Sequence, residues 1–181
     1  MLEENGLTTE KMIKHLSATS GAFNYPAAHF DMVRVGLGFY GLWPSKELEK
    51  RFSRRYPLKP VLTWQTIISE VKTLIADGKI GYDFTEKVKR GTRIAILPIG
   101  YWHGYPRHLS SIGEVLVRGQ RAKVLGRVSM DMIAVDVTKV KSVKVGEVVT
   151  LVGPKISARN LAEKIGTSQY EVVTRINPLI K

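Results

Sequence analysis

From residue 61 onward the chain is a succession of short apolar, β-branched runs, and turn-forming residues separate one run from the next. Two of the breaks, Asp77-Gly78 and Gly119-Gln120, favour tight β-hairpins because such dipeptides tolerate positive φ. Many short strands joined by short turns are typical of an antiparallel barrel. We therefore predict a mainly β fold, a closed or nearly closed antiparallel barrel, with strands over residues 61–75, 92–99, 114–118, 122–128, 132–137 and 148–152.

The first 56 residues have a different pattern, in which short apolar stretches alternate with loops and a glycine-rich turn. That rhythm is typical of βα units. Near the other end of the chain, Ser157 can cap a short helix and Gly166 can end it. The remaining predictions are a polar helix over residues 8–14, strand, loop and turn over 15–41, a basic linker over 46–60, and a domain boundary after residue 56.

Composition excludes several classes of chemistry. The chain has no cysteine, so it forms no disulfide, no thiolate zinc site and no cysteine nucleophile. No apolar run approaches the roughly 18–20 residues of a membrane span, and the first residues lack the basic and apolar segments of a secretory signal. These features predict a cytoplasmic protein without a membrane partner.

The net charge of +12 raises the question of a nucleic-acid partner. The basic residues fall in separate groups at the ends of apolar runs, which favours solvated loops over one binding face. We therefore predict no nucleic-acid partner. We also predict no metal site, because no metal-ligand spacing is present among His15, His29, His103 and His108.

The first candidate site is the segment Arg34-Val35-Gly36-Leu37-Gly38, in which an arginine follows an apolar run and glycines then open a turn. Unpaired backbone N–H groups at the start of a helix suit a phosphate. In a (β/α)8 barrel, the loops after the last strands form such a site. The same spacing of glycines is also typical of an ordinary turn.

Two further candidates involve tyrosines and an acid. Tyr82 and Tyr101 each follow a glycine. A tyrosine can act as a general acid or base where a cation stabilises the phenolate, but beside glycine it is also a common packing residue. Asp131 lies between Met130 and Met132. An acid at such a position is either a substrate contact or a plain loop residue.

Taken together and in this order, these segments resemble alanine racemase, a pyridoxal-phosphate-dependent enzyme of fold type III. HLSATSG and FDMVRVGLGFYGL resemble the end of its (β/α)8 barrel. IGYDFT, LPIGYWHGYPRHLS, GEVLVRGQRAKVLGRVSMDMIAVDVT, GEVVTLVG and YEVVTRI resemble its C-terminal β-domain. The resemblance implies that residues 1–56 are the last strands and helices of the barrel plus a linker. Residues 57–181 would then be the C-terminal β-domain with a short C-terminal helix.

The resemblance also implies a role for each candidate residue. Tyr82 matches one of two catalytic bases, and Arg34 matches the arginine that faces the pyridine nitrogen of the cofactor. An always-charged guanidinium keeps that nitrogen unprotonated, which favours reprotonation of the substrate over side reactions. The remaining implied roles are support of Arg34 by His15, phosphate binding by Thr19, Gly36 and Leu37, substrate binding by Met130 and Asp131, and an access-corridor position for Tyr101.

The implied activity is the interconversion of L- and D-alanine for peptidoglycan precursors, by a homodimer whose active site is shared between subunits. The second base is the lysine that holds the cofactor as a Schiff base. That lysine belongs to the N-terminal part of the family's barrel, and no lysine of this chain lies in a matching motif. We therefore expect this C-terminal part to be inactive alone. Two departures from the family pattern are His103, where an aspartate is usual, and Asn177-Pro178 near the end.

Other functions remain open from the sequence. The same fold could racemise another amino acid, such as serine or lysine. A basic β-barrel could instead bind single-stranded nucleic acid through charge and aromatic stacking, which the tryptophans Trp43, Trp64 and Trp102 would allow. The domain could also serve only in dimerisation.

Overall fold

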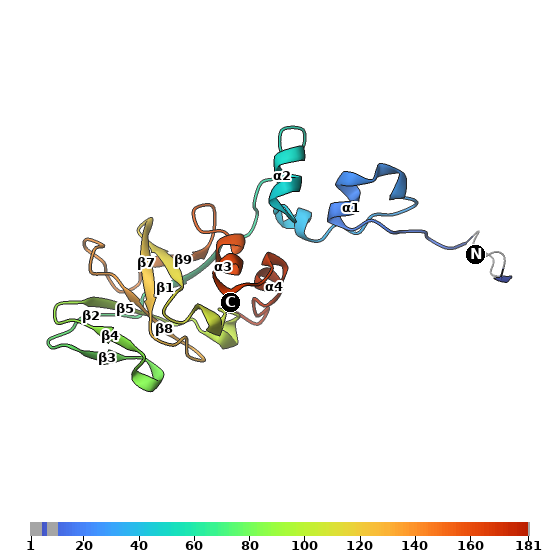
Figure 1. Cartoon of the computed structure of the whole chain (residues 1–181). Coiled ribbons are helices and arrows are strands. Elements are labelled where there is room, and N and C mark those ends of the chain that lie inside the picture. The colour runs from blue at the N-terminus through green and yellow to red at the C-terminus, as the bar shows by residue number, and fades with distance from the viewer. Residues whose placement is uncertain (1–4, 7–10, 181) are drawn as a thin grey trace. The chain divides into compact units, whose positions relative to one another are not determined.

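The structure is a computed structural model that describes residues 5, 6 and 11–180. It divides into two compact units, Met1–Val61 and Leu62–Lys181, coloured blue to cyan and cyan to red in Figure 1. The family's domain boundary was predicted after residue 56, and it stays a prediction. None of the helices among the described residues is long and apolar enough to cross a lipid bilayer.

The first unit is built from short helical segments around one strand-like contact. Ala18 and Arg34 form an isolated parallel bridge, and an aromatic cluster forms where Phe23 packs 4.8 Å from Trp43 and 5.7 Å from Phe52, measured between ring centroids. Its elements are α1 (Thr19–Asn24), η2 (Pro26–Ala28), η3 (Leu37–Tyr40) and α2 (Lys46–Phe52).

Three predictions for this unit need correction. The strands predicted within residues 15–41 are reduced to the single bridge between Ala18 and Arg34, and residues 19–24 form helix α1 instead. The segment predicted as a linker contains α2, because Ser45 caps it by accepting a hydrogen bond from the Leu48 N–H, and Leu48 is buried. Residues 11–14 are not helical, and residues 8–10 of the helix predicted over 8–14 lie outside the described part of the chain.

The second unit is a curled antiparallel sheet, which confirms the predicted mainly β fold. Its seven strands have the order β1-β9-β6-β7-β8-β5-β2, and a separate pair is formed by β3 and β4. The strands are β1 (Trp64–Ile67), β2 (Glu70–Thr73), β3 (Gly78–Ile80), β4 (Glu86–Val88), β5 (Arg93–Leu97), β6 (Glu114–Val117), β7 (Gln120–Leu125), β8 (Ile133–Asp136) and β9 (Val148–Val152).

The sheet curls back on itself because its two edge strands, β1 and β2, are consecutive in the chain. At the junction, the Ile68 N–H donates to the Glu147 carbonyl, 2.9 Å away and just before β9. The next N–H, of Ser69, donates to the Ile96 carbonyl of β5 at 2.9 Å. One stretch of chain therefore pairs with both sides of the sheet. The core inside the curl consists of fully buried aliphatic side chains, among them Leu97, Val115, Val117, Val124, Val135 and Leu151.

The hairpin predicted at Asp77-Gly78 is wrong, whereas the one at Gly119-Gln120 is present. β2 and β3 flank Asp77 but do not pair, because β2 pairs with β5 and β3 pairs with β4. Asp77 instead accepts a hydrogen bond from the Arg90 N–H at 2.7 Å, which ties down the two ends of the β3–β4 ribbon. β6 and β7 form the other hairpin, in which Val117 pairs with Gln120.

Two helices complete the second unit, α3 (Ala158–Ile165) and α4 (Gln169–Thr174). Ser157 and Asn160 cap α3 reciprocally, with distances of 3.2 and 3.0 Å between the backbone nitrogens and side-chain oxygens. Gly166 ends the helix in the left-handed region, at φ 67°. This is the helix that the sequence predicts.

Candidate functional site

A pocket of about 590 Å³ in the second unit brings together three of the predicted site residues, Tyr82, Met130 and Asp131. Tyr82 starts the single turn η4 (Tyr82–Phe84), which joins β3 to β4. Met130 and Asp131 lie in the connection from β7 to β8. Both segments lie in the second unit, and in Figure 1 η4 is the light-green turn at the end of the β3–β4 ribbon. The pocket therefore collects a phenol, a thioether and a carboxylate from two loops far apart in sequence.

The two loops approach so closely because each has a glycine at the contact. A Cβ on Gly81 would lie 3.0 Å from the Arg127 nitrogen and 3.2 Å from the Gly126 Cα. A Cβ on Gly126 would lie 3.0 Å from the Ile80 carbonyl oxygen. Both glycines also have positive φ, 78° and 73°, which side chains disfavour. The backbone contact thus depends on glycine at both positions.

Two acidic residues of the β3–β4 ribbon bind the β7 strand and the loop that follows it. Asp83 lies next to Tyr82, and its Oδ2 is 2.7 Å from Arg127 Nε. Glu86, at the start of β4, accepts a hydrogen bond from Lys123 Nζ at 2.8 Å. Burial alone would raise the pKa of Glu86, but hydrogen bonds from Lys123 and Ser111 and the Lys123 charge outweigh it, so its pKa lies below the ordinary value.

Tyr101 lies outside the lining of this pocket, but its turn is bonded to the Met130 loop. The Tyr101 N–H donates to the Ser129 carbonyl at 3.0 Å, and the Trp102 N–H donates to the Met130 carbonyl at 3.1 Å. Gly100 makes the contact possible, because a Cβ there would lie 2.3 Å from both of those carbonyl oxygens. The turn carrying Tyr101 and the loop carrying the predicted substrate residues therefore hold each other in place.

His103 closes the same turn, η5 (Tyr101–His103). Its Nδ1 accepts a hydrogen bond from the Gly100 N–H at 3.1 Å, and its ring meets that of Trp102 edge to face. The histidine thus supplies a hydrogen-bond acceptor to the backbone of this turn.

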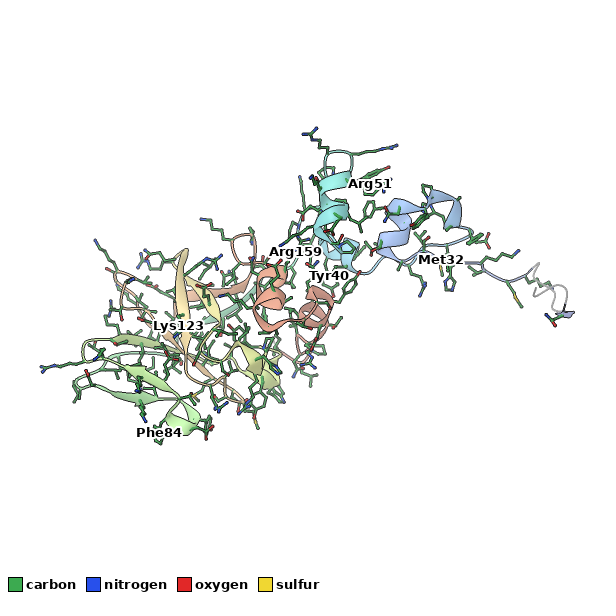
Figure 2. All side chains as sticks on the ribbon, viewed as in Figure 1. Met32, Tyr40, Arg51, Phe84, Lys123 and Arg159 are labelled. Atoms are coloured by element: carbon green, nitrogen blue, oxygen red, sulfur yellow. The ribbon has the colours of Figure 1, made fainter. Side chains whose placement is uncertain are left out.

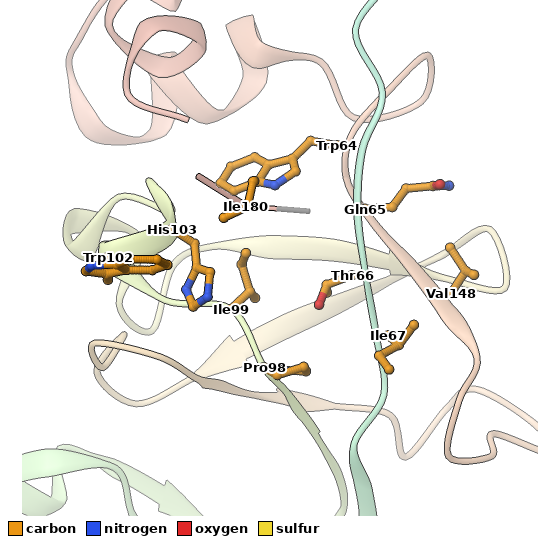
Figure 3. A pocket seen from close by; sticks show the side chains of 10 residues that line it. All are labelled: Trp64, Gln65, Thr66, Ile67, Pro98, Ile99, Trp102, His103, Val148 and Ile180. Atoms are coloured by element: carbon orange, nitrogen blue, oxygen red, sulfur yellow. The ribbon is translucent and has the colours of Figure 1, made fainter. Parts of the chain in front are cut away.

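A second hollow of about 500 Å³ lies beside β1 and η5, and Figure 3 shows it. Trp102 and His103 line one side, with Trp64 and Ile180 next to them, and Gln65 and Val148 lie on the opposite side. None of the predicted site residues lines this hollow. The pocket that Tyr82 lines is therefore the candidate active site of this unit.

In the first unit, the predicted phosphate-binding residues converge on one hydroxyl. Thr19 is buried, and its Oγ1 accepts hydrogen bonds from the N–H groups of Gly36 and Gly38, at 3.3 and 3.4 Å. A Cβ on Gly36 would meet no atom within 4 Å, so the space beside that N–H is open. Leu37 is buried and begins η3. Because Oγ1 accepts from both N–H groups, the Thr19 hydroxyl keeps its own proton to donate, and a phosphate could take it beside the open space at Gly36.

Arg34 and His15 are exposed in the first unit. The guanidinium of Arg34 donates to the Leu16 carbonyl at 3.3 Å, and the Arg34 backbone N–H donates to Ser17. Among the described residues no hydrogen bond joins His15 to Arg34. The support of Arg34 by His15 stays a prediction.

Sequence reasoning missed Asp83 and Arg127, which line the same pocket as Tyr82. A carboxylate directly after the predicted base and an arginine three residues before Met130 were visible signals. Only the fold shows that they pair, because it places η4 against the β7–β8 connection.

Comparison with known proteins identifies the family. The profile described as "Alanine racemase, C-terminal domain" matches residues 61–181, and "Alanine racemase, N-terminal domain" matches residues 2–44. The alanine racemase of Leptospira interrogans serovar copenhageni is 40% identical over 177 residues, which cover 93% of this chain and 46% of that protein. The enzyme of Halothermothrix orenii is 44% identical, with 96% and 46% covered.

Solved structures that resemble this chain belong to the same family. The Bacillus anthracis alanine racemase with bound L-Ala-P matches with a TM-score of 0.87 and 33% identity over 97% of this chain and 45% of that one. The Clostridium difficile alanine racemase in complex with cycloserine matches with a TM-score of 0.85 and 32% identity, covering 97% and 46%. The chain spans about half the length of the relatives it matches. It belongs to the alanine racemase family, of which it contains the C-terminal domain and a short part of the N-terminal domain.

Proposed function

We propose that this chain supplies the C-terminal part of an alanine racemase, which interconverts L- and D-alanine in the cytoplasm for peptidoglycan precursors. The single observation that carries the proposal is the pocket in which Tyr82, Met130 and Asp131 meet. A phenol beside a carboxylate and an apolar thioether provides a proton-transfer group next to a surface that fits a small amino acid.

Tyr82 is the proposed base of this chain. Its side chain is 67% exposed, so the phenol is available to a substrate held by another polypeptide. Racemisation requires one proton acceptor on each face of the substrate Cα, and the phenolic oxygen of Tyr82 would take or return the proton on one face. The lysine on the opposite face would come from the barrel segment that this chain lacks.

Met130 and Asp131 are proposed to bind the substrate. Both lie in the β7–β8 connection, both are exposed, and both line the same pocket as Tyr82. The thioether would pack against the small side chain of alanine, and the loop backbone would limit the space for larger ones. In the family arrangement, this wall would face the barrel of the partner subunit in a homodimer, with Tyr101 at the access corridor.

Thr19, Gly36, Leu37 and Arg34 are proposed to bind pyridoxal 5′-phosphate. The Thr19 hydroxyl, which accepts from the Gly36 and Gly38 N–H groups, keeps a proton to donate to the phosphate. The guanidinium of Arg34 is exposed, and beyond its one bond to the Leu16 carbonyl it keeps donors that could face the pyridine ring. When bound, the cofactor would supply an electron sink that makes the substrate Cα–H acidic. Arg34 would keep the ring nitrogen unprotonated, with His15 as its support.

The test is complementation between two polypeptides. The purified chain, pyridoxal phosphate and L-alanine are incubated with and without a separately made N-terminal half, and D-alanine is measured. We expect activity only in the mixture. Tyr82→Phe in the mixture should reduce the rate about 10²- to 10⁴-fold, because one of the two proton-transfer groups is lost.

Tyr170→Phe is the matched control, since Tyr170 lies on α4 and outside the pocket. That variant should keep the wild-type rate. Racemisation by the chain alone, or an unaffected Tyr82→Phe mixture, would contradict the proposal. A panel of amino acids in the same assay would show whether serine or lysine is preferred to alanine.

A further inference from the structure

We propose that Asp83 and Arg127 form a clasp that positions Tyr82, an inference about the site whose catalytic role rests on the proposed function. Asp83 directly follows Tyr82, and its Oδ2 lies 2.7 Å from Arg127 Nε. Arg127 directly follows Gly126, at the backbone contact between the two loops. The pair therefore joins the turn that carries the base to the loop that carries Met130 and Asp131.

The turn needs such a restraint because its backbone is in an unfavourable region. Asp83 has φ 59° and ψ 14°, and Phe84 has φ 50°. Aspartate tolerates the left-handed region, whereas a bulky aromatic residue there is strained. Two such residues in succession, directly after Tyr82, do not hold this conformation by local preference. The conformation must be imposed by contacts with the rest of the fold.

Few other contacts are available at the tip of the turn. The Phe84 N–H donates to the Gly81 carbonyl at 3.1 Å, which is a bond within the turn itself. The Phe84 ring lies at the outer end of the ribbon and is 67% exposed, so its packing adds little (Figure 2). Among the described residues, the ion pair between Asp83 and Arg127 joins this tip to the rest of the domain.

Glu86 fixes the other end of the same segment. Its carboxylate accepts hydrogen bonds from Lys123 Nζ at 2.8 Å and from the Gly126 N–H at 3.4 Å. With Glu86 fixed, an opening of the tip between Gly81 and Glu86 separates Asp83 from Arg127. Asp83 side-chain exposure is 67% and that of Arg127 is 37%, so solvent weakens the pair, and it acts on the local opening of the turn rather than on global stability.

Asp83 and Arg127 touch neither substrate nor cofactor in this arrangement. They are positioning residues, which would act on the reaction through the turn that carries Tyr82.

Amide hydrogen exchange on the whole chain tests the clasp without any need for activity. The variants are Asp83→Asn, which keeps a residue that tolerates left-handed backbone, Arg127→Met, their combination, and the conservative Arg127→Lys. We expect the amide exchange rates of residues 81–85 to rise about two- to fivefold in each variant that removes a charge, because a solvent-exposed ion pair stabilises a local structure by only about that factor. The double variant should equal the single ones, and Arg127→Lys should restore most of the protection.

Arg175→Met is the matched control, because Arg175 forms an exposed ion pair with Glu171 on α4, at 3.1 Å. It should leave residues 81–85 unchanged. Three results would overturn the clasp. They are equal exchange rates in wild type and Asp83→Asn, additive effects in the double variant, and faster exchange throughout β5 and β8.

The complementation assay then separates the two proposals. With an active wild-type mixture, Asp83→Asn and Arg127→Met should lower kcat about tenfold and leave KM for alanine nearly unchanged, because a misplaced base affects proton transfer more than binding. Loss of protection with an inactive wild-type mixture would overturn the racemase proposal and support the clasp. An active mixture whose exchange and kcat both ignore Asp83→Asn would overturn the clasp alone.

Discussion

His103 shows how a single side chain organises the neighbourhood of Tyr101. Its Nδ1 accepts the Gly100 N–H, as the acceptor of a capping residue does at the start of a helical turn. An aspartate, the residue that the resemblance to the family predicts at this position, would supply a carboxylate oxygen as acceptor. The histidine therefore preserves an acceptor while it changes the charge beside the turn.

We expect His103→Asp to keep most of the stability of the domain and His103→Ala to lower the free energy of unfolding by about 1 kcal/mol relative to it. Both variants remove the edge-to-face contact with Trp102, so their difference reports the charged acceptor alone and not the lost ring contact. Urea denaturation of the two variants measures it. Equal stabilities would show that the hydrogen bond from Gly100 contributes nothing.

At this same scale, the candidate residues were predictable and their partners were not. Tyr82, Met130 and Asp131 belong to motifs whose resemblance to a family indicates a role, and the structure places all three on one pocket. Asp83 and Arg127 belong to separate segments, and nothing local to either one indicates that they meet. Their pairing depends on tertiary approach of glycines at positions 81 and 126, which only the folded chain defines.

At the scale of elements, strand prediction succeeded where turn chemistry and pairing agreed, and failed where they did not. Gly119-Gln120 joins strands that do pair, β6 and β7. Asp77-Gly78 has an equally good turn signal, but β2 gains more by pairing with β5 along the edge of the large sheet. Helix α2 was missed because charged and proline-containing surroundings hid the Ser45 cap and the single buried Leu48.

Glu114 connects two elements, since it lies on β6 and contacts Arg121 on β7 and Lys164 on α3, at 2.9 and 3.3 Å. Burial would raise its pKa, but hydrogen bonds and charges from Lys164 and Arg121 outweigh that effect, so the pKa lies below the ordinary value. A lowered pKa in the folded state means that the ionised form stabilises the fold. That stabilisation is present above the unfolded-state pKa of about 4.3 and is lost as the pH falls through the lower folded-state value.

We expect Glu114→Gln to lower the free energy of unfolding by about 1 kcal/mol at pH 7. It should also make stability less dependent on pH below about 4.5, where Glu86 would still contribute. Denaturation at a series of pH values measures both effects. Glu70→Gln is the matched control, because the Glu70 pair with Lys72 is about half exposed and screened by solvent. The interpretation fails if both variants show the same pH dependence.

At the scale of the whole molecule, the two compact units differ in what they contain. Residues 62–181 include every strand of the seven-stranded sheet, the separate β3–β4 pair, and both α3 and α4. Most of the buried aliphatic side chains belong to this unit, and its sheet closes through its own junction at Ile68 and Ser69. It meets the requirements of an independently folding domain, with its own core and paired strands.

We therefore expect a chain of residues 62–181 to fold by itself and to unfold in one cooperative transition. Its Tm should lie within about 4 °C of the sheet transition of the whole chain, which corresponds to a change of about 1 kcal/mol or less. Calorimetry of both chains measures this.

Amide hydrogen exchange of residues 81–85 in the chain of residues 62–181 tests whether the second unit also forms its part of the site without the first unit. Tyr82, Asp83 and Arg127 all belong to the second unit, and so does the loop that carries Met130 and Asp131. If that unit alone determines their arrangement, the shortened chain should protect the turn as well as the whole chain does. Lower protection, or a broad transition at a much lower temperature, would mean that residues 1–61 help to form this wall of the site, so that the two units do not fold independently.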